Sequence, residues 1–352
     1  MMSKTRSRRW VVPRTVLLIA LLVGSLGFAR PADHGHRSGP PPEGKLDMSG
    51  DIGDYVEGEI DDPVHDPTLF EDRGTYYVFS TGILNPDDPG GIFARRSRGS
   101  LAGPWESLGE IPLPEWTLDY NVNHLWAPHV VRRGTWFYLY YSASSFGVNR
   151  SAIGAARTQT PGDLDSWEDL GPILTSDASV DYNAIDPMVF KDRGQWWIAF
   201  GSFWDGIKLQ RLASMTEPVG EIHSLARRAP DVEFNPIENP QIFKKGSYYY
   251  LMTSWDFCCQ GVNSTYKIAV GRSRSVTGPY VDRDGVPLTE GGGTVILESR
   301  GNQIGTGAPD VLKEFGRYYM VHHYYDGDAD GVIRMQIREV EWKHGWPYFP
   351  PD

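Results

Sequence analysis

The chain has few cysteines, and those present exclude two common roles. Only two of the 352 residues are cysteine, Cys258 and Cys259, and they are adjacent. This spacing excludes the CxxC arrangement that binds a metal or carries out thiol exchange. In an exported protein the pair could form a vicinal disulfide that stiffens its loop, with two reduced thiols as the alternative.

Helical patterns and a surplus of basic residues are also missing. No long stretch after the N-terminal segment combines a helical apolar period with freedom from Gly and Pro, which argues against a helical fold. The net charge is −11, from 34 basic and 45 acidic residues. Such a chain has no general electrostatic attraction for nucleic acid or another polyanion, so a neutral polymer is the better candidate partner.

One apolar run is present, at the N-terminus. Five basic residues precede an apolar core at residues 16–28, and this pattern predicts a signal peptide over residues 1–29. The core is short for a transmembrane span, although an uncleaved anchor is the alternative. Removal of the signal takes away five basic residues and no acidic ones, which moves the net charge from −11 to −16.

The residues that follow predict an exported protein with a short leader. Residues 30–46 are rich in Pro, Gly, His and Ser and are expected to form a flexible leader. Residues 47–352 are then expected to form one domain, secreted or periplasmic, with no stable membrane partner after signal cleavage. Because the sequence gives no clear sign of an oligomer interface, we expect a monomer.

A strand–turn–strand core recurs along this domain. Each copy places a glycine between two runs of aromatic and β-branched residues. The glycines are Gly74, Gly134, Gly194, Gly246 and Gly316. They lie 60, 60, 52 and 70 residues apart, the length of a structural unit larger than a hairpin. Five units of four short strands predict an all-β, five-bladed β-propeller. A β-sandwich or an open array of hairpins is the alternative.

The position eight residues before each glycine carries three acids. It holds Asp66, Trp126, Asp186, Glu238 and Ala308. Equivalent positions of a repeat lie at equivalent places around its axis, so the three acids are expected to meet at the centre. Cleavage of a glycosidic bond needs a protonated acid and an ionised carboxylate, and a third carboxylate raises the pKa of the acid. A turn or strand-start role is the alternative for each Asp, because a proline follows it.

Several short stretches also match one enzyme family. They include Val64-His65-Asp66-Pro67, Leu125-Trp126-Ala127-Pro128, Ser144-Ser145-Phe146-Gly147, Asn183-Ala184-Ile185-Asp186-Pro187, Phe200-Gly201-Ser202-Phe203-Trp204, Cys258-Cys259 and His323-Tyr324-Tyr325-Asp326. In these stretches the chain resembles the glycoside hydrolase family 43 arabinanases, five-bladed propellers that cut α-1,5-linked arabinan with inversion. The resemblance covers nearly all of residues 62–346 and is more specific for the endo-acting branch.

The resemblance implies a role for each acid. Asp66 would be the general base that activates water, and Glu238 the general acid. Asp186 would tune the pKa of Glu238 and hold it in place. An inverting site needs room for a water, so the carboxyl groups of Asp66 and Glu238 are expected to lie roughly 6.5–9.5 Å apart.

The resemblance also implies sugar contacts. Trp126 and Phe146 would be stacking platforms, with core packing as the alternative for each. The other residues in stretches that line sugar subsites are Gly147, Asn183, Ser202 and Phe203.

Two positions depart from the family pattern. Relatives carry Gly-Pro-Gly-His in the last blade, with the histidine near an ion usually taken as calcium, whereas this chain has Ala308 at that place. We therefore assign no metal ligand. Calcium is still possible, because the loss of one ligand weakens the hold on a hydrated ion without removing the ion. Asp310 or His323 could substitute, with packing or a strand end as the alternative role for each. At His129 relatives carry an aspartate, so His129 either alters the pH optimum or satisfies a local hydrogen bond.

The sequence thus favours an exported endo-acting arabinanase. An exo-acting α-L-arabinofuranosidase or β-xylosidase of the same family is one alternative and would need a blocked pocket. A non-catalytic sugar-binding propeller is the other, supported only by the missing histidine. Short loops between blades favour an open cleft.

Overall fold

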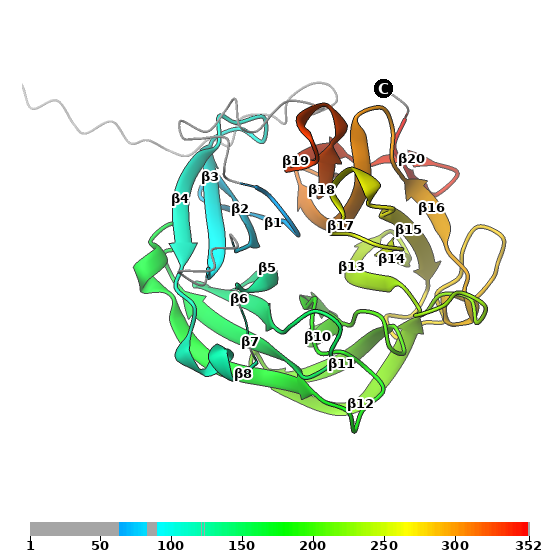
Figure 1. Cartoon of the computed structure of the whole chain (residues 1–352), viewed down its shortest axis with the longest axis horizontal. Coiled ribbons are helices and arrows are strands. Elements are labelled where there is room, and N and C mark those ends of the chain that lie inside the picture. Colours follow the sequence, from blue (N-terminus) through cyan, green and yellow to red (C-terminus); the bar gives the residue numbers. More distant parts are fainter. Residues whose placement is uncertain (1–62, 83–89, 121, 123, 351–352) are drawn as a thin grey trace, which may run out of the picture. The chain divides into compact units, whose positions relative to one another are not determined.

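Antiparallel strands make up most of the described chain, and they are arranged as five blades around a centre (Figure 1). The computed structural model describes residues 63–82, 90–120, 122 and 124–350. These residues belong to one compact unit, residues 38–352. The expected signal peptide and leader lie outside the described residues. Among those residues, no helix has the length and apolar character needed to cross a membrane.

Each of the first four blades is a four-stranded sheet whose strands follow one another in sequence order. The first blade contains β1 (Thr68–Asp72), β2 (Thr75–Thr81), β3 (Ile92–Arg98) and β4 (Glu106–Ile111). The second contains β5 (Trp126–Arg133), β6 (Trp136–Ala143), β7 (Ser151–Thr158) and β8 (Glu168–Ser176). The third contains β9 (Met188–Asp192), β10 (Gln195–Phe200), β11 (Ile207–Ser214) and β12 (Glu217–Ala226). The fourth contains β13 (Ile237–Lys245), β14 (Tyr248–Trp255), β15 (Lys267–Ser273) and β16 (Thr294–Leu297).

The fifth blade differs from the expected four strands. Its sheet has three, β17 (Gln303–Glu314), β18 (Arg317–Asp326) and β19 (Val332–Glu339), and a separate hairpin follows, β20 (Glu341–Lys343) and β21 (Trp346–Tyr348). Just before the first blade, the N–H of Val64 donates to the Ile333 carbonyl oxygen on β19, at 3.2 Å. The fifth blade therefore contacts the residues that lead into the first blade.

Short 3-10 helices lie in the connections between strands. They are η2 (Glu115–Tyr120), η3 (Leu164–Ser166), η4 (Gly261–Asn263), η5 (Leu288–Glu290) and η6 (Gly327–Ala329).

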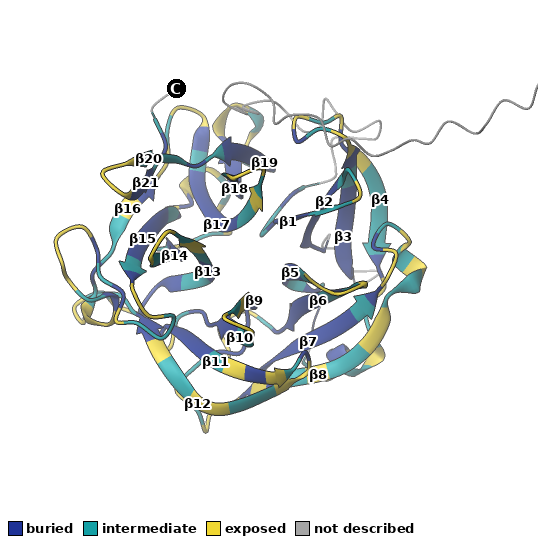
Figure 2. Cartoon of the chain, turned by 180° about the vertical axis from the view of Figure 1, so that it is seen from behind, coloured by how far each residue is buried: buried dark blue, intermediate teal, exposed yellow. Residues whose placement is uncertain are grey.

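The hydrophobic core is divided into five clusters, one between each pair of neighbouring blades. Representative pairs are Val78 with Val321, Phe70 with Phe137, Tyr140 with Val189, Leu209 with Leu251, and Met252 with Met320. Figure 2 shows buried residues concentrated on the middle strands of the blades, such as β3, β7 and β15, whereas β8 and β12 carry much of the exposed surface. Because every blade packs on both neighbours, burial fixes the start of each innermost strand near the axis.

The innermost strands share an unusual backbone conformation at equivalent residues. Each is entered through a residue with left-handed backbone that precedes a proline: Asp66, Ala127, Asp186, Asn239 and Ala308, with φ between 42° and 56°. A residue with a Cβ pays roughly 1–2 kcal/mol for this conformation. In every blade the strand ends six residues later, at Asp72, Arg133, Asp192, Lys245 and Glu314. These five pre-proline residues are therefore the true equivalents of one another.

This register corrects the sequence-based count in two blades. The equivalents of Asp66 are Ala127 and Asn239, so the prediction that Glu238 shares the position of the two aspartates is wrong by one residue. The cause lies in the turns. In the first, third and fifth blades the glycine is the second turn residue and follows a residue with positive φ, such as Arg73, whereas Gly134 and Gly246 come first in their turns.

Candidate active site

Residues from all five blades line a cavity on the axis. Its walls are the pre-proline residues with their prolines, Asp66-Pro67, Ala127-Pro128, Asp186-Pro187, Asn239-Pro240 and Ala308-Pro309. A second cavity of about 490 Å³ follows further along the innermost strands and shares His129, Met188, Gln241 and Asp310 with the first. The structure thus brings Asp66 and Asp186 together at one end of the axis, as the sequence predicted.

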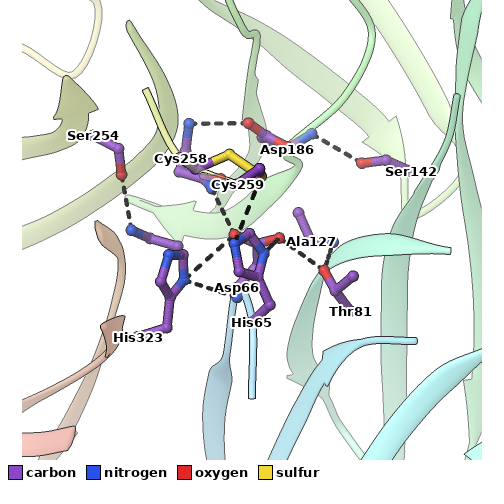
Figure 3. A network of polar contacts seen from close by, with 12 residues as sticks. His65, Asp66, Thr81, Ala127, Ser142, Asp186, Ser254, Cys258, Cys259 and His323 are labelled. Carbon is purple, nitrogen blue, oxygen red and sulfur yellow. Dashed lines mark hydrogen bonds and ion pairs between the residues drawn. A yellow bond between two sulfur atoms is a disulfide. The ribbon is translucent and has the colours of Figure 1, made fainter. Parts of the chain in front are cut away.

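A repeated hydrogen bond holds these pre-proline residues. At three junctions between blades, a hydroxyl on the second strand of one blade accepts the N–H of the pre-proline residue in the next. Figure 3 shows Thr81 with Ala127 (3.0 Å), Ser142 with Asp186 (2.9 Å), and Ser254 with the backbone N–H of the last blade, that of Ala308 (2.8 Å). This bond replaces a backbone partner for a group that would otherwise be buried unpaired.

The pattern changes at the two remaining junctions, next to Glu238 and at Asp66. Between the third and fourth blades the corresponding residue is Gly201, which has no hydroxyl, and the Asn239 N–H donates to Asp186 Oδ2 instead (3.1 Å). Ser202 is then free to donate its hydroxyl to Glu238. Between the fifth and first blades, His323 Nδ1 accepts the Asp66 N–H at 3.1 Å.

Asp66 is held as an ionised carboxylate. Its Oδ2 lies 2.7 Å from His65 Nδ1 and accepts the Thr81 hydroxyl at 2.7 Å (Figure 3). Burial alone raises the pKa of Asp66, but the His65 charge and hydrogen bond, together with Thr81, outweigh it and hold the pKa below its usual value. Asp66 can therefore accept a proton from water.

His65 is charged because of the same pair. Burial lowers the pKa of His65, yet the Asp66 charge and the hydrogen bonds to Asp66 and Tyr325 raise it to about 10. The Tyr325 hydroxyl lies 2.9 Å from His65 Nε2 and fixes the ring from its other side. In the sequence, His65 stands out only as part of the Val64-His65-Asp66-Pro67 stretch. Its contact with Tyr325 joins residues 260 positions apart, so no local sequence pattern predicts it.

The pKa values of Asp186 and Glu238 are shifted in the opposite direction, above their usual values. Burial raises the pKa of Glu238 to about 7, with the Asp66 charge adding to burial, while Ser202 and His65 oppose it. Burial, then the charges of Glu238 and Asp66, raise the pKa of Asp186 well above its usual value. The raised pKa of Glu238 increases the share of this carboxyl that keeps its proton at a given pH, and a protonated carboxyl is what a general acid requires.

His323 is a neutral, buried ring. It stacks on His65 with the ring centroids 4.0 Å apart. Burial, then the His65 charge, lower the pKa of His323 well below its usual value. Ligand atoms of His65, Asp66 and His323 lie within 4.8 Å of one another, as in a metal site. However, the Asp66 carboxylate is already engaged by His65 and Thr81, so ion pairing accounts for this cluster.

The residues at the axis do not suit calcium, which takes six to eight oxygen ligands. Ala308 offers no side-chain donor. Asp310 does not replace the missing histidine, because four hydrogen bonds use both of its oxygens. Its Oδ2 accepts from the Thr68 hydroxyl (2.7 Å) and the Leu69 N–H (2.8 Å), and its Oδ1 from Gln241 Nε2 (2.6 Å) and the Val311 N–H (2.8 Å).

His129 has a local structural role. Its Nδ1 accepts the Val189 N–H at 3.2 Å, which joins the second and third blades. Burial lowers the pKa of His129. Of the two roles considered for His129, a change of the pH optimum or a local hydrogen bond, the structure contains the hydrogen bond.

The adjacent cysteines form a disulfide in the loop after β14. The backbone N–H of Cys259 donates to the Tyr325 hydroxyl at 2.7 Å, and Tyr325 in turn contacts His65. The disulfide loop therefore supports the histidine that pairs with Asp66, a role that the sequence did not indicate.

The expected sugar-contact residues differ in exposure. Phe146 is 74% exposed and its ring centroid lies 5.0 Å from that of the partly exposed Trp126, so core packing does not account for Phe146. Phe203 is partly exposed, and Gly147 lies in an exposed turn with φ 77°. Ser202 is buried against Glu238, and Asn183 is 97% buried, being 3% exposed, so a direct sugar contact by Asn183 would have to be small.

Known proteins match this chain over most of its length. The model of the glycosyl hydrolases family 43 matches residues 60–347. The extracellular endo-alpha-(1->5)-L-arabinanase 1 of Bacillus subtilis (strain 168) is 39% identical over 83% of this chain and 89% of that protein. The extracellular exo-alpha-(1->5)-L-arabinofuranosidase ArbA of Cellvibrio japonicus (strain Ueda107) is 37% identical, covering 81% and 85%. The solved structure of the GH43 endo-arabinanase from Bacillus licheniformis matches with a TM-score of 0.75 and 39% identity, covering 82% of this chain and 98% of that one.

Proposed function

Because the chain belongs to glycosyl hydrolase family 43 and is a glycoside hydrolase, we propose that it is an exported enzyme that cleaves internal α-1,5 linkages of arabinan with inversion. The observation that carries this proposal is the opposite shift of the pKa values among three acids at one end of the axis. His65 and Thr81 hold the pKa of Asp66 below its usual value, whereas burial raises the pKa of Glu238 to about 7 and that of Asp186 well above its usual value.

The proposed mechanism uses the three acids in separate roles. Asp66 takes a proton from a water, whose oxygen attacks the anomeric carbon. The bond from that carbon to the glycosidic oxygen breaks, and Glu238 gives its proton to the departing oxygen. Attack and departure on opposite faces invert the configuration. After the reaction Asp66 carries a proton and Glu238 is ionised, so exchange with water restores the starting state.

Neighbouring groups prepare these roles. Asp186 accepts the Asn239 N–H and thereby fixes the backbone next to Glu238, and its negative charge when ionised would favour a protonated Glu238. Asn239 Nδ2 lies 3.4 Å from Asp66 Oδ1, so one residue contacts both aspartates. No step is assigned to a metal ion, because the residues at the axis do not suit calcium.

Endo cleavage is favoured over exo cleavage by two observations. The Bacillus relative that is 39% identical is named an endo-arabinanase, although the Cellvibrio relative is named an exo-acting enzyme. Exposed aromatic residues flank the acids on two sides, Phe146 with Trp126 and Phe203 with Phe257, as suits a chain that continues past the cleaved bond. A non-catalytic propeller would not need acids whose pKa values are shifted in opposite directions.

Export is supported by the names of both relatives, which describe extracellular proteins, and by the signal-like N-terminus.

The test is a time course of products from linear arabinan. We expect mixed oligosaccharides early, with a rapid fall in viscosity. Arabinose alone as the first product would instead establish the exo reading. A folded protein that binds arabinan and releases nothing would be a non-catalytic propeller.

A further inference from the structure

Six basic side chains gather on the last hairpin and on the strands beside it, and we call this surface the basic face. The hairpin, β20 and β21, lies next to β16 of the fourth blade (Figures 1 and 2). The six residues come from the fourth blade, the fifth blade and the hairpin, and they are Lys245, Arg272, Arg274, Arg283, Lys313 and Lys343. Lys245 and Arg272 are half-buried, and the other four are exposed.

Aromatic rings join these cations into one surface. Arg272 Cζ lies 4.3 Å from the ring centroid of Trp346, and Lys245 Nζ lies 3.8 Å from that of Trp342. The Tyr250 ring contacts both tryptophan rings, with centroids 5.1 and 6.3 Å apart, so the two halves of the face are continuous. The other four cations also lie over rings of this group: Arg274 over Tyr248 (4.7 Å), Arg283 over Trp346 (5.8 Å), Lys313 over Tyr318 (5.5 Å) and Lys343 over Tyr348 (5.4 Å). A ring face attracts a cation and holds it in place.

The charge of the basic face is not neutralised by acids. In the part of the chain that the structure describes, none of the six cations has a carboxylate partner, whereas the adjacent Lys244 lies 3.7 Å from Asp192. Burial, then the positive charge of Lys313, lower the pKa of Lys245, as expected when two like charges lie close together. The face therefore concentrates positive charge in a chain whose net charge is −11.

Attachment of the hairpin accounts for only two of the six cations. Arg272 and Arg283 donate to carbonyl oxygens of the hairpin, at 3.1 and 3.2 Å. Arg274 donates to the Tyr248 hydroxyl at 3.0 Å. Within the described residues, the three lysine amino groups of the face donate no hydrogen bond. Neutral side chains could cover the rings equally well, so these charges indicate an anionic ligand.

The basic face lies away from the catalytic acids. Glu238 is near the start of β13 and Lys245 is its last residue, so the length of the strand, roughly 20 Å, separates them. Lys313 likewise lies near the far end of β17, beyond Ala308. A ligand on this face would therefore leave the site of cleavage open.

The chemistry of the face favours a sugar polymer that carries carboxylates. Arginine and lysine bind carboxylates, and the partly exposed rings of Trp342 and Tyr348 offer surface to the C–H groups of sugar rings. A nucleic acid duplex carries one negative charge per ~1.7 Å, and the net charge of −11 opposes the approach of such a dense polyanion. A polysaccharide with at most one carboxylate on each ring spaces its charges more widely, so this repulsion is weaker.

We propose that the basic face is a second binding site of this protein and takes an acidic polysaccharide, a polymer of uronic acid units. Binding there would hold the enzyme on an acidic polymer while the acids at the axis remain free to cut a neutral one. The proposed export bears only on where such a polymer is met. Binding to the face can be measured whether or not the protein cuts arabinan.

The test is the affinity of the purified protein for polygalacturonate, measured by calorimetry. A triple variant, Arg274→Gln with Lys313→Gln and Lys343→Gln, removes three exposed charges and is expected to weaken binding roughly 10-fold. Salt should weaken binding of the wild-type protein, because exposed charges are screened. Lys191→Gln is the matched control and should change nothing. Lys191 is also exposed and lies 5.6 Å from the ring centroid of Trp196, but it stands alone on the third blade.

The control polymer is fully methyl-esterified polygalacturonate, which has the same sugar rings without charge and should not bind. Equal binding of the ester, or wild-type affinity in the glutamine variant, would overturn the proposal. Tighter binding of single-stranded DNA than of polygalacturonate would also overturn it and assign the face to nucleic acid.

Two further measurements separate loss of charge from damage to the fold. The variant Arg274→Lys with Lys313→Arg and Lys343→Arg keeps all three charges and should keep the affinity for polygalacturonate. Loss of binding in this variant would show that charge is not the cause. The glutamine variant should cut short neutral arabino-oligosaccharides at the wild-type rate. A large loss of that activity would contradict a site separate from the acids.

Discussion

The charge on each acid follows from one neighbour more than from burial. Asp66 and Glu238 are both mostly, though not fully, buried, yet the pKa of Asp66 falls below its usual value and that of Glu238 rises to about 7. The difference is His65, which bonds Asp66 directly at 2.7 Å and affects Glu238 only through its charge. The position of one histidine thus separates a base from an acid.

Replacing Glu238 by glutamine removes the proposed proton donor while keeping the shape of the side chain. We expect kcat on linear arabinan to fall by about 10³-fold, within the range for loss of a general acid. Oligosaccharide affinity measured by calorimetry should stay within about twofold, since the amide can still contact Ser202. Loss of binding together with activity, in a folded variant, would contradict the role of Glu238 as the acid.

The His65→Gln variant tests whether His65 keeps Asp66 ionised, as the proposed base must be. Loss of the charge should raise the pKa of Asp66, because a paired cation that favours the ionised carboxylate is removed. Because Asp66 must be ionised, kcat/KM should then fall at a higher pH on the acid side. The alkaline fall is set by loss of the Glu238 proton near pH 7 and should move little. A pH profile with an unchanged acid limb would contradict the pairing.

At the scale of the element, one residue in the innermost strands joins three blades. Asp310 on β17 accepts hydrogen bonds from Thr68 and Leu69 on β1 and from Gln241 on β13. Thr68 also lies 3.4 Å from the Val130 N–H on β5. Asp310, which the sequence analysis named as a possible substitute metal ligand, therefore joins the last blade to the first.

Asp310→Ala should be among the most destabilising single changes. It leaves four donors without an acceptor, and each buried unpaired group costs about 1–3 kcal/mol, so the free energy of unfolding should fall by at least about 3 kcal/mol. Denaturant titration measures this, with Asp310→Asn, which keeps one acceptor oxygen, as the milder control. A loss below about 0.5 kcal/mol would show that the bonds are not formed.

The innermost strands also show how much of the fold and of the candidate site could be predicted from the sequence. The five repeats, the all-β class and the central placement of Asp66 and Asp186 followed from pattern. The equivalence of Glu238 did not, because the turn at Gly246 places its glycine one step earlier. Counting from the X-Pro pairs, Ala127-Pro128 and Asn239-Pro240, would have given the correct register. The His65–Tyr325 contact could not be found this way, since it depends on packing between the first and last blades.

At the scale of the whole molecule, hydrogen bonds near the axis join neighbouring blades. They include Thr68 with Asp310, Asp310 with Gln241, and His129 with the Val189 N–H. Each of these bonds links two blades directly through protein groups.

We therefore expect chelation to leave the enzyme unchanged. Dialysis against EDTA should alter kcat/KM on arabinan by less than about twofold and should not lower Tm, since no binding energy is lost from the native state. Ala308→His serves as a comparison, because it restores the side chain that relatives carry. A large loss of activity in EDTA, reversed by calcium, would show that a metal contributes after all.

The most direct test of the account is the anomeric configuration of the first products. Proton NMR of linear arabinan in the first minutes after addition of enzyme should show new reducing ends in the β configuration, with α appearing later by mutarotation. This result would establish direct attack by a water that Asp66 activates. Reducing ends that appear first as α would instead require a covalent intermediate and contradict the roles assigned to Asp66 and Glu238.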